Sequence, residues 1–369
     1  MAGKVLNYYA GGNTGRGFYS LFESNVKGLD RLFILKGGPG TGKSSLMKRL
    51  ADEWGTKGYD LEIIHCSSDN DSIDGVMIPK LKFGMVDGTA PHIIEPTAPG
   101  AIEEYVNLGL AWDSKKLIRE KENIVALHTE IKNAFQLAYV TFAKGLQEHD
   151  ELEEIYFKEM NFAKANHLTK ELIQQLFEDN RLSKAADVRH RFLGAATPQG
   201  AVDYIPNITE GLKKRYFLKG RAGTGKSTLL KKLAAAADER GFDTEIYHCG
   251  FDPNSIDMIV VRELSFAIFD STDPHEYFPD RDGDEIIDLY LAAVTPGTDE
   301  KYAIEINEVH KRYKDKMKEG TVCLAKAKSL HDELEKYYIK AMDFSIIDRI
   351  YEEINEEIIR LENNLAPLI

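Results

Sequence analysis

Gly37-Gly-Pro-Gly-Thr-Gly-Lys43-Ser-Ser45 is a glycine-rich segment that occurs a second time as Gly220-Arg-Ala-Gly-Thr-Gly-Lys226-Ser-Thr228. Both segments have the spacing Gly-x4-Gly-Lys-Ser. Glycines allow backbone conformations that bring amide N–H groups close to phosphate oxygens, and a helix that begins there points its positive end at the anion. The pattern predicts two phosphate-binding loops, named here the first glycine loop (residues 37–45) and the second glycine loop (residues 220–228).

Each residue type in the two loops has a role in such a site. Lys43 and Lys226 place a cation on the β- and γ-phosphates, and Ser44 and Ser227 offer a hydroxyl to Mg²⁺. The expected nucleotide contacts are Gly37, Gly38, Pro39, Gly40, Thr41, Gly42, Lys43, Ser44 and Ser45 in the first loop, and Gly220, Arg221, Ala222, Gly223, Thr224, Gly225, Lys226, Ser227 and Thr228 in the second.

The chain is an internal duplication. Residues 11–100 align without a gap with residues 194–283, with 35 identities in 90 positions. The similarity weakens after residue 100 and returns at His149-Asp-Glu-Leu-Glu153 and His331-Asp-Glu-Leu-Glu335. We therefore predict two domains, the first copy (residues 1–183) and the second copy (residues 184–369).

Both copies have the same order of predicted elements. In the first copy an apolar strand precedes the glycine loop, a helix follows over residues 43–54, and two more strands follow over residues 61–66 and 81–87. This order predicts an α/β fold with a mostly parallel sheet in each copy. The tails, residues 101–180 and 284–363, are rich in Glu, Lys, Leu and Ala. We expect each to form a long helical hairpin or a small bundle on its own copy, with an apolar stripe that packs internally or binds a partner protein or a second copy of the chain.

Composition narrows the classes of function. The chain has 369 residues and a net charge of −13, and an acidic surface repels nucleic acid, so general nucleic-acid binding is not expected. No apolar run reaches the roughly 18 residues of a membrane helix, and the N-terminus lacks a signal-peptide pattern. Three cysteines are an odd number for a disulfide framework and favour free thiols. These features predict a cytoplasmic protein without a membrane partner.

The glycine loops and their context resemble the P-loop NTPase superfamily over the sheet part of both copies. The tandem pattern is similar to a poorly characterised bacterial family of duplicated P-loop proteins labelled as ATPases or nucleotide kinases. The resemblance implies two tandem P-loop NTPase domains that bind ATP or GTP with Mg²⁺.

Asp87 and Asp270 end apolar strands and begin the phrase Asp-x-Thr-x-Pro-His in both copies. An acidic residue there resembles the superfamily's second motif, which binds Mg²⁺ through water. The other interpretation is an Asp that caps its own turn. Hydrolytic members often carry Glu directly after this Asp, whereas Gly88 and Ser271 stand here.

A second acidic group follows the strand after the glycine-loop helix. Asp69 and Asp252, and five residues later Asp74 and Asp257, recur in both copies. They could orient water, bind Mg²⁺ or accept a proton from a substrate hydroxyl, and we take Asp69 and Asp252 as catalytic candidates with the two lysines. Alternatively, the serine between them, Ser72 in the first copy, caps a short helix.

The sequence leaves alternative roles for the histidines and arginines near these segments. His65 and Cys66 are adjacent on a strand and point to opposite faces, so a zinc site is not expected there. His92 and His275 are either γ-phosphate sensors or loop residues with local hydrogen bonds. Arg16 and Arg221 differ between the copies and either reach across to the other half or lie in solvent.

Three functions fit these patterns. The leading prediction is an ATPase whose turnover couples the two halves mechanically. The second is a kinase for a nucleotide or another small molecule, and the third is a nucleotide-dependent switch or scaffold with little turnover.

Overall fold

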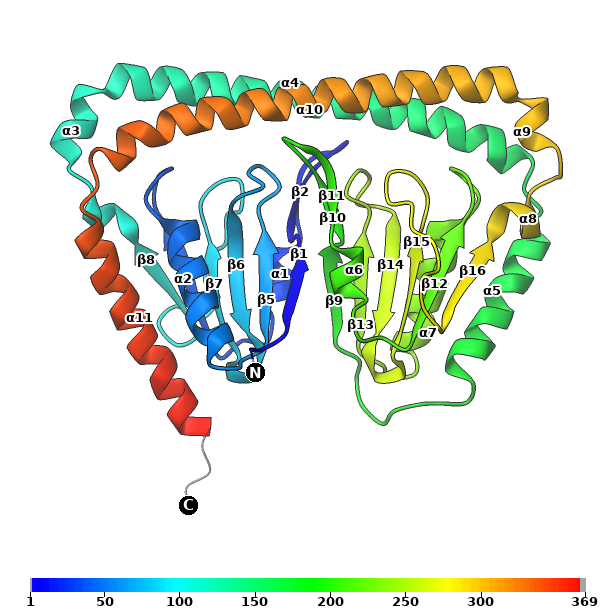
Figure 1. Cartoon of the computed structure of the whole chain (residues 1–369), viewed down its shortest axis with the longest axis horizontal. Helices are drawn as coiled ribbons and strands as arrows, with labels where there is room; N and C mark the ends of the chain where they lie inside the picture. Colours follow the sequence, from blue (N-terminus) through cyan, green and yellow to red (C-terminus); the bar gives the residue numbers. More distant parts are fainter. Residues whose placement is uncertain (1, 366–369) are drawn as a thin grey trace.

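The structure is a computed structural model that describes residues 2–365. Two α/β halves stand side by side beneath two long helices that cross above both (Figure 1). The elements of the first copy are β1 (Val5–Tyr8), β2 (Gly11–Thr14), β3 (Gly17–Ser20), α1 (Phe22–Val26), β4 (Arg31–Lys36), α2 (Lys43–Thr56), β5 (Leu61–His65), β6 (Ile73–Ile78), η1 (Pro79–Leu81), β7 (Phe83–Asp87), β8 (Glu103–Asn107), η2 (Leu108–Ala111), α3 (Ser114–Arg119), α4 (Lys121–Lys158) and α5 (Phe162–Phe177).

The second copy repeats this order. Its elements are β9 (Val188–Phe192), β10 (Gly194–Thr197), β11 (Gly200–Asp203), α6 (Ile205–Ile208), β12 (Lys214–Lys219), α7 (Lys226–Asp238), β13 (Thr244–His248), β14 (Ile256–Val261), η3 (Arg262–Leu264), β15 (Phe266–Asp270), β16 (Asp284–Asp288), α8 (Leu289–Ala293), α9 (Thr298–Lys301), α10 (Ala303–Ile339) and α11 (Phe344–Leu365).

Each copy contains a six-stranded mixed sheet. The strand order in the first is β1-β5-β6-β7-β4-β8, and the second has the matching order β9-β13-β14-β15-β12-β16. All neighbours are parallel except that β6 and β14 run antiparallel to both of their neighbours. The expected mostly parallel α/β fold is therefore confirmed, with one reversed strand in each sheet.

The reversed strand β6 lies where the sequence also allowed a short helix. Ser72 does not cap a short helix, because β6 begins at the next residue and Asp74 lies within that strand. Every residue of β6 is buried. A strand covered on both faces needs no alternation of polar and apolar residues, which removes the usual signal for a strand.

The order of strands places each glycine loop beside an acidic strand end. β4 leads into the first glycine loop and pairs in parallel with β7, with Leu35 opposite Asp87. β12 and β15 are paired in the same way, with Leu218 opposite Asp270. The carboxyl ends of parallel strands meet at one edge of a sheet, so loop and carboxylate are neighbours in both copies.

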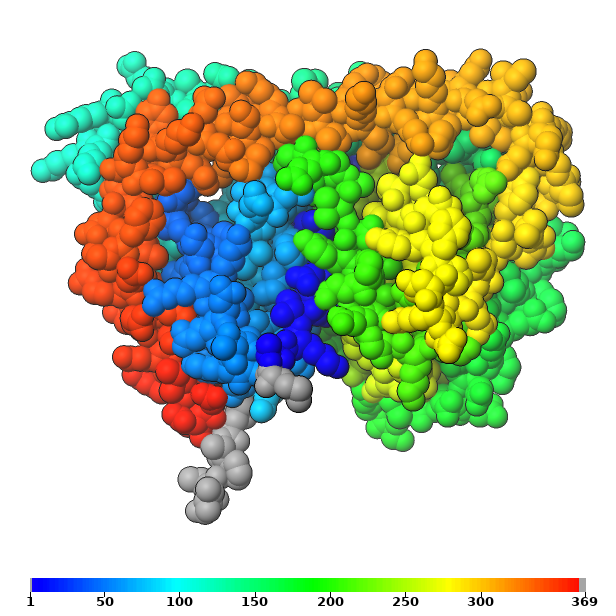
Figure 2. Space-filling view, in the orientation of Figure 1, coloured from blue at the N-terminus to red at the C-terminus, as the bar shows by residue number. Residues whose placement is uncertain are grey.

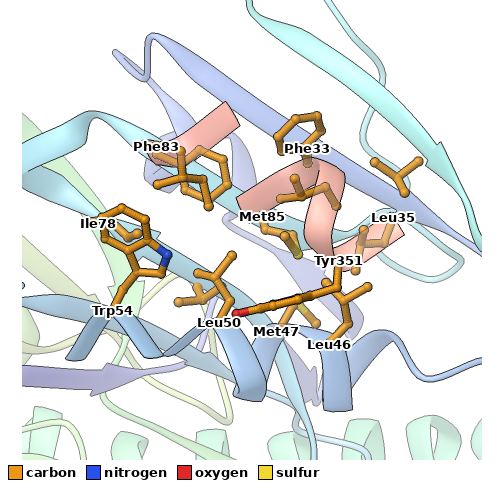
Figure 3. Close-up of a cluster of buried hydrophobic side chains, with 14 of the residues drawn as sticks. Phe33, Leu35, Leu46, Met47, Leu50, Trp54, Ile78, Phe83, Met85 and Tyr351 are labelled. Carbon is orange, nitrogen blue, oxygen red and sulfur yellow. The ribbon is translucent and has the colours of Figure 1, made fainter. Parts of the chain in front are cut away.

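One face of each sheet is covered by its glycine-loop helix and by a helix of the other copy. Figure 3 shows α2 side chains, including Leu50 and Trp54, packed with Phe33 and Phe83 of the first sheet and with Tyr351 of α11. On the second sheet, α5 of the first copy contributes Leu172 and Phe177 to the matching core. Each sheet is thus completed by the tail of the opposite copy.

The two tails differ from the helical hairpins expected on each copy. They begin with a strand, β8 or β16, each of which joins its own sheet as an edge strand. The long helices α4 and α10, of 38 and 37 residues, then extend about 57 Å at ~1.5 Å per residue and pack against each other above both sheets. Figure 2 shows α10, in orange, running across both halves. The amphipathic pattern specifies an apolar stripe but not which copy covers it.

The halves also share a core. Apolar side chains from both sheets, together with α1 and α6, form one continuous buried cluster. At its edge Arg191 is buried and pairs with Glu62 of the first copy at 2.7 Å and with Glu245 of its own copy at 3.3 Å. Tyr9 and Phe192 exchange backbone hydrogen bonds of 3.0 and 2.8 Å across the boundary. The two copies therefore form a single packed body.

Among residues 2–365, none of the helices has an apolar stretch of the length needed to cross a membrane.

Candidate functional site

The glycine loops adopt backbone conformations that require glycine at two positions each. Gly40 and Gly42 have φ of 67° and 90°, and Gly223 and Gly225 have φ of 73° and 85°. Gly42 and Gly225 are the residues directly before α2 and α7. The first turn of each helix thus presents its backbone N–H groups, and its positive dipole end, to the space over the loop.

The loop lysines lie against their own loops and beside the predicted Mg²⁺ carboxylates. Lys43 Nζ donates to the carbonyls of Gly37 and Gly38 at 3.1 and 3.0 Å and lies 3.7 Å from Asp87 Oδ2. Lys226 Nζ donates to the Arg221 carbonyl at 2.8 Å and lies 3.5 Å from Asp270 Oδ2. The same cation–carboxylate pair therefore occurs at both loops.

Both interpretations of Asp87 and Asp270 have a structural counterpart. Asp87 Oδ1 accepts hydrogen bonds from the Thr89 backbone N–H and hydroxyl at 2.8 and 2.6 Å, which forms the local turn. Asp270 Oδ1 accepts the equivalent pair from Thr272 at 3.1 and 2.6 Å. The second oxygen of each carboxylate faces the loop lysine. One oxygen thus shapes the turn while the other remains on the side of the glycine loop.

The loop serines connect the glycine loops to the reversed strands. Ser44 Oγ accepts a hydrogen bond from the Ile73 backbone N–H at 3.1 Å, and Ser227 Oγ accepts from Ile256 at 3.0 Å. The segment that carries the second acidic group is therefore tied directly to the glycine loop in each copy.

Asp69 and Asp252 lie in the segments that follow β5 and β13, and both side chains accept hydrogen bonds or form ion pairs with neighbouring residues. Asp69 accepts from the Asp71 backbone N–H at 3.0 Å and the Ser72 hydroxyl at 2.8 Å, and Lys328 of α10 lies 3.5 Å away. Asp252 accepts from Arg16 of the first copy at 2.7 Å. Both catalytic candidates thus contact a cation from the opposite copy.

A buried cluster that the sequence did not predict lies next to the first glycine loop. The side chains of Cys66, Asp74 and His92 are buried and bring one ligand atom each within 4.8 Å of one another, and His92 Nε2 lies 3.2 Å from Asp74 Oδ2. His65 points elsewhere, toward Asn7 at 2.8 Å, as expected for adjacent residues on a strand. All three members recur in the alignment of the copies, as Cys249, Asp257 and His275, and this recurrence was the signal available.

Burial controls the proton affinities in these clusters. It raises the pKa of the Cys66 thiol and that of the Asp74 carboxyl, and the charge of Asp87 acts on Asp74 in the same direction. In the second copy, burial and the charge of Asp270 raise the pKa of Asp257 to about 6. Asp74 and Asp257 therefore each hold a proton more tightly than a free aspartate does, beside the glycine loop of their own copy.

The second copy holds its histidine with a partner that the first copy lacks. His275 Nδ1 lies 2.8 Å from Asp203 Oδ2, whereas Ser20 stands at the equivalent position of the first copy. Burial opposes a charge on His275, but the Asp203 carboxylate outweighs it and raises the pKa of His275. The two sites are thus electrostatically different despite their common plan.

Each glycine loop is covered by the long helix of the other copy. A Cβ on Gly40 would lie 3.0 Å from the backbone oxygen of Glu335, and a Cβ on Gly38 would lie 2.7 Å from the Tyr338 ring. At the second loop, a Cβ on Gly223 would lie 2.5 Å from the backbone oxygen of Glu153. Glu153 and Glu335 end the two His-Asp-Glu-Leu-Glu segments, and the recurrence of these segments in the sequence did not indicate which loop they contact.

The two arginines that distinguish the copies have different destinations. Arg16 crosses the boundary to Asp252, as noted, and its neighbour Gly15 donates a backbone hydrogen bond of 2.9 Å to Phe251. Arg221 stays within its own copy, where it pairs with Asp299 at 2.8 Å. Tyr156 of α4 donates to the same Asp299 at 2.9 Å. Only Arg16 therefore reaches the opposite half as considered from the sequence.

The residues around each loop fit a nucleotide phosphate chain with Mg²⁺. Positive-φ glycines, a helix N-terminus and a lysine supply the donors that an anion needs, and a serine hydroxyl with one carboxylate oxygen supplies hard oxygen ligands for the cation. No protein-family model, no curated protein and no solved structure matches this chain.

Proposed function

We propose that this protein is an Mg²⁺-dependent ATPase with one nucleotide site at each glycine loop, and that its turnover moves the two halves relative to one another. The observation that carries the proposal is the repeated lysine–carboxylate pair at a helix N-terminus, at 3.7 Å for Lys43 and Asp87 and 3.5 Å for Lys226 and Asp270. A triphosphate engages the lysine and the helix N-terminus together. Ser44 and Asp87 in the first site, and Ser227 and Asp270 in the second, would hold Mg²⁺, which would supply positive charge against the phosphates.

Coupling between the halves is supported by the exchanged tails. Each glycine loop touches its own sheet and also the long helix of the other copy, through Glu335 at the first loop and Glu153 at the second. A change in loop conformation on binding or losing a phosphate therefore acts directly on the opposite half. Packed helices respond to such a change by shifting between discrete arrangements rather than by bending smoothly.

Hydrolytic P-loop proteins often activate water with a glutamate directly after the Mg²⁺ aspartate. Gly88 and Ser271 stand at that position here, so another carboxylate must activate the water. Asp69 and Asp252 are held by local hydrogen bonds and by cations of the opposite copy. Asp74 is buried, and its Oδ2 lies 3.2 Å from His92 Nε2 but accepts no hydrogen bond of good geometry within residues 2–365. We therefore favour Asp74, with Asp257 in the second copy, as the proton acceptor.

The same carboxylate supports a second candidate function, transfer of the γ-phosphoryl group to a small molecule or nucleotide. A buried aspartate beside the phosphate loop can accept the proton of a substrate hydroxyl as readily as that of water. The residues after Asp87 and Asp270 are Gly88 and Ser271 instead of glutamate, and this favours phosphoryl transfer over hydrolysis.

The decisive comparison is ATP loss by the purified full chain, alone and with a panel of nucleosides, nucleotides and metabolites, with analysis for phosphorylated acceptors. The ATPase proposal predicts release of inorganic phosphate without any acceptor. Turnover only in the presence of an acceptor contradicts it and supports the phosphotransferase. Tight Mg-ATP binding with no turnover in either case supports a nucleotide-dependent switch.

A further inference from the structure

The two His-Asp-Glu-Leu-Glu segments are the strongest duplicated feature that the glycine loops do not account for. They lie on α4 (residues 149–153) and α10 (residues 331–335) at equivalent places. In each, the histidine Nδ1 faces the last glutamate one turn on, at 3.7 Å for His149 and Glu153 and 3.6 Å for His331 and Glu335. The equivalent pairs have the same geometry although the residues around them differ.

Both segments are positioned on the glycine loop of the opposite copy. The backbone oxygen of Glu335 sits against Gly40, and that of Glu153 sits against Gly223, which is the equivalent glycine of the second loop. Because the fourth loop residue is glycine in both copies, the helix backbone can approach closely there. A side chain at either glycine would meet backbone atoms that cannot rotate away.

The surroundings of the segments connect them to the predicted phosphate chemistry. Burial lowers the pKa of His331 against the opposing charge of Glu335, and the charges of Lys328 and, more weakly, Lys43 act in the same direction as burial. One turn before His331, Lys328 pairs with Asp69 of the first copy at 3.5 Å. On the other side, the His149 ring packs 6.4 Å from the ring of Phe251, the residue before Asp252. Each histidine thus lies among groups that surround the opposite copy's loop.

We infer that the nucleotide sites are completed crosswise, with His331 of the second copy contacting the triphosphate at the first glycine loop and His149 of the first copy contacting the triphosphate at the second. With Nδ1 turned to the glutamate, Nε2 remains as the atom available to the ligand. An imidazole so placed hydrogen-bonds phosphate oxygens that neither the loop amides nor the lysine engages. The inference rests on the proposed triphosphate sites.

The test isolates one site at a time with loop variants and titrates the full chain with Mg²⁺ and a non-hydrolysable ATP analogue by calorimetry. In a Lys226→Ala background only the first site remains, and His331→Gln is expected to lower its affinity at least tenfold. In a Lys43→Ala background only the second site remains, and His149→Gln is expected to do the same. His167→Gln is the control, since His167 also faces a glutamate one turn on, with Nε2 3.2 Å from Glu171, but lies on the surface of α5.

The outcomes separate this inference from the proposed function. If His331→Gln weakens the second site and His149→Gln weakens the first, or if neither changes affinity, the crosswise arrangement is wrong while the loops can still bind nucleotide. If Lys43→Ala and Lys226→Ala leave both sites intact, the triphosphate sites themselves are wrong. His149 and His331 are partly exposed, so we expect their glutamine variants to fold. Circular dichroism of each variant checks this.

Discussion

Gly40 of the first glycine loop packs against the backbone of Glu335, a residue of the opposite copy, so closely that a Cβ on the glycine would lie 3.0 Å from the Glu335 backbone oxygen. Gly223 and Glu153 repeat this relationship at the second loop. A duplicated chain has thus exchanged its tails, so that each glycine loop is built from one copy and covered by the other.

Gly223→Ala tests the contact of the second loop with α4. The substitution strains a backbone with φ of 73° and also places a Cβ 2.5 Å from Glu153 O. Gly211→Ala is the control, because Gly211 has the same φ of 73° and no heavy atom within 4 Å of the added Cβ. Backbone strain alone costs ~1–3 kcal/mol, and we expect Gly223→Ala to lower the free energy of unfolding in urea clearly more than Gly211→Ala. Equal losses would show that the helix does not press on the loop.

Arg191→Met tests the ion network between the halves. Arg191 is buried between Glu62 and Glu245, and its removal takes away the cation that pairs with Glu62 and leaves Glu245 with Arg262. Breaking a buried pair of this kind typically costs ~3–5 kcal/mol. Lys82→Met, which removes an exposed pair with Asp30, is expected to change stability by less than ~0.5 kcal/mol. A similar, small effect of both variants in chemical denaturation would contradict the role assigned to Arg191.

The partly buried carboxyl of Asp257 predicts a specific dependence on pH. Its pKa is about 6 in the folded chain against 3.8 when unperturbed, so the folded state holds this proton more tightly than the unfolded chain does. Asp257 therefore lowers the free energy of unfolding as pH rises from about 4 through about 6. Carbon-13 NMR should detect one aspartate carboxyl that titrates near the raised value and disappears in Asp257→Asn. A spectrum in which every aspartate titrates below pH 5 would refute the shift.

Asp74→Asn tests the assigned proton acceptor. The variant keeps the size of the side chain and removes its ability to take a proton. We expect turnover to fall about 10²–10⁴-fold, the usual contribution of general acid–base catalysis, while Mg-ATP affinity stays close to wild type. Asp71→Asn, on the same segment but exposed, serves as the control. Unchanged turnover in Asp74→Asn would show that another group accepts the proton.

Local signals in the sequence were enough to predict the glycine loops, the strand that ends at Asp87 and the repeated order of elements in the two copies. Gly40 and Gly42 specify their own backbone conformations, and Asp87 follows an unbroken apolar strand. The reversed strand β6 carried no such signal, because a strand buried on both faces loses its alternation. The meeting of Cys66, Asp74 and His92 depends on how three separate segments pack, which spacing along the chain does not encode.

The exchange of tails was beyond sequence reasoning for a related reason. Tyr351 lies on an amphipathic helix whose apolar stripe is plain, but the stripe fits either sheet equally well on composition. The course of α10 over both halves decides that α11 reaches the first sheet. The recurrence of Glu153 and Glu335 marked the segments as important without indicating which loop they touch.

The most direct test of the account is the number of Mg-ATP binding sites per chain, measured by calorimetry with a non-hydrolysable analogue. We predict two sites in the wild-type chain, one in Lys43→Ala, one in Lys226→Ala and none in the double variant. The catalytic cost of losing each such donor is about 3 kcal/mol, or at least a hundredfold in turnover. A double variant that still binds two nucleotides with wild-type affinity would contradict the assignment of the glycine loops.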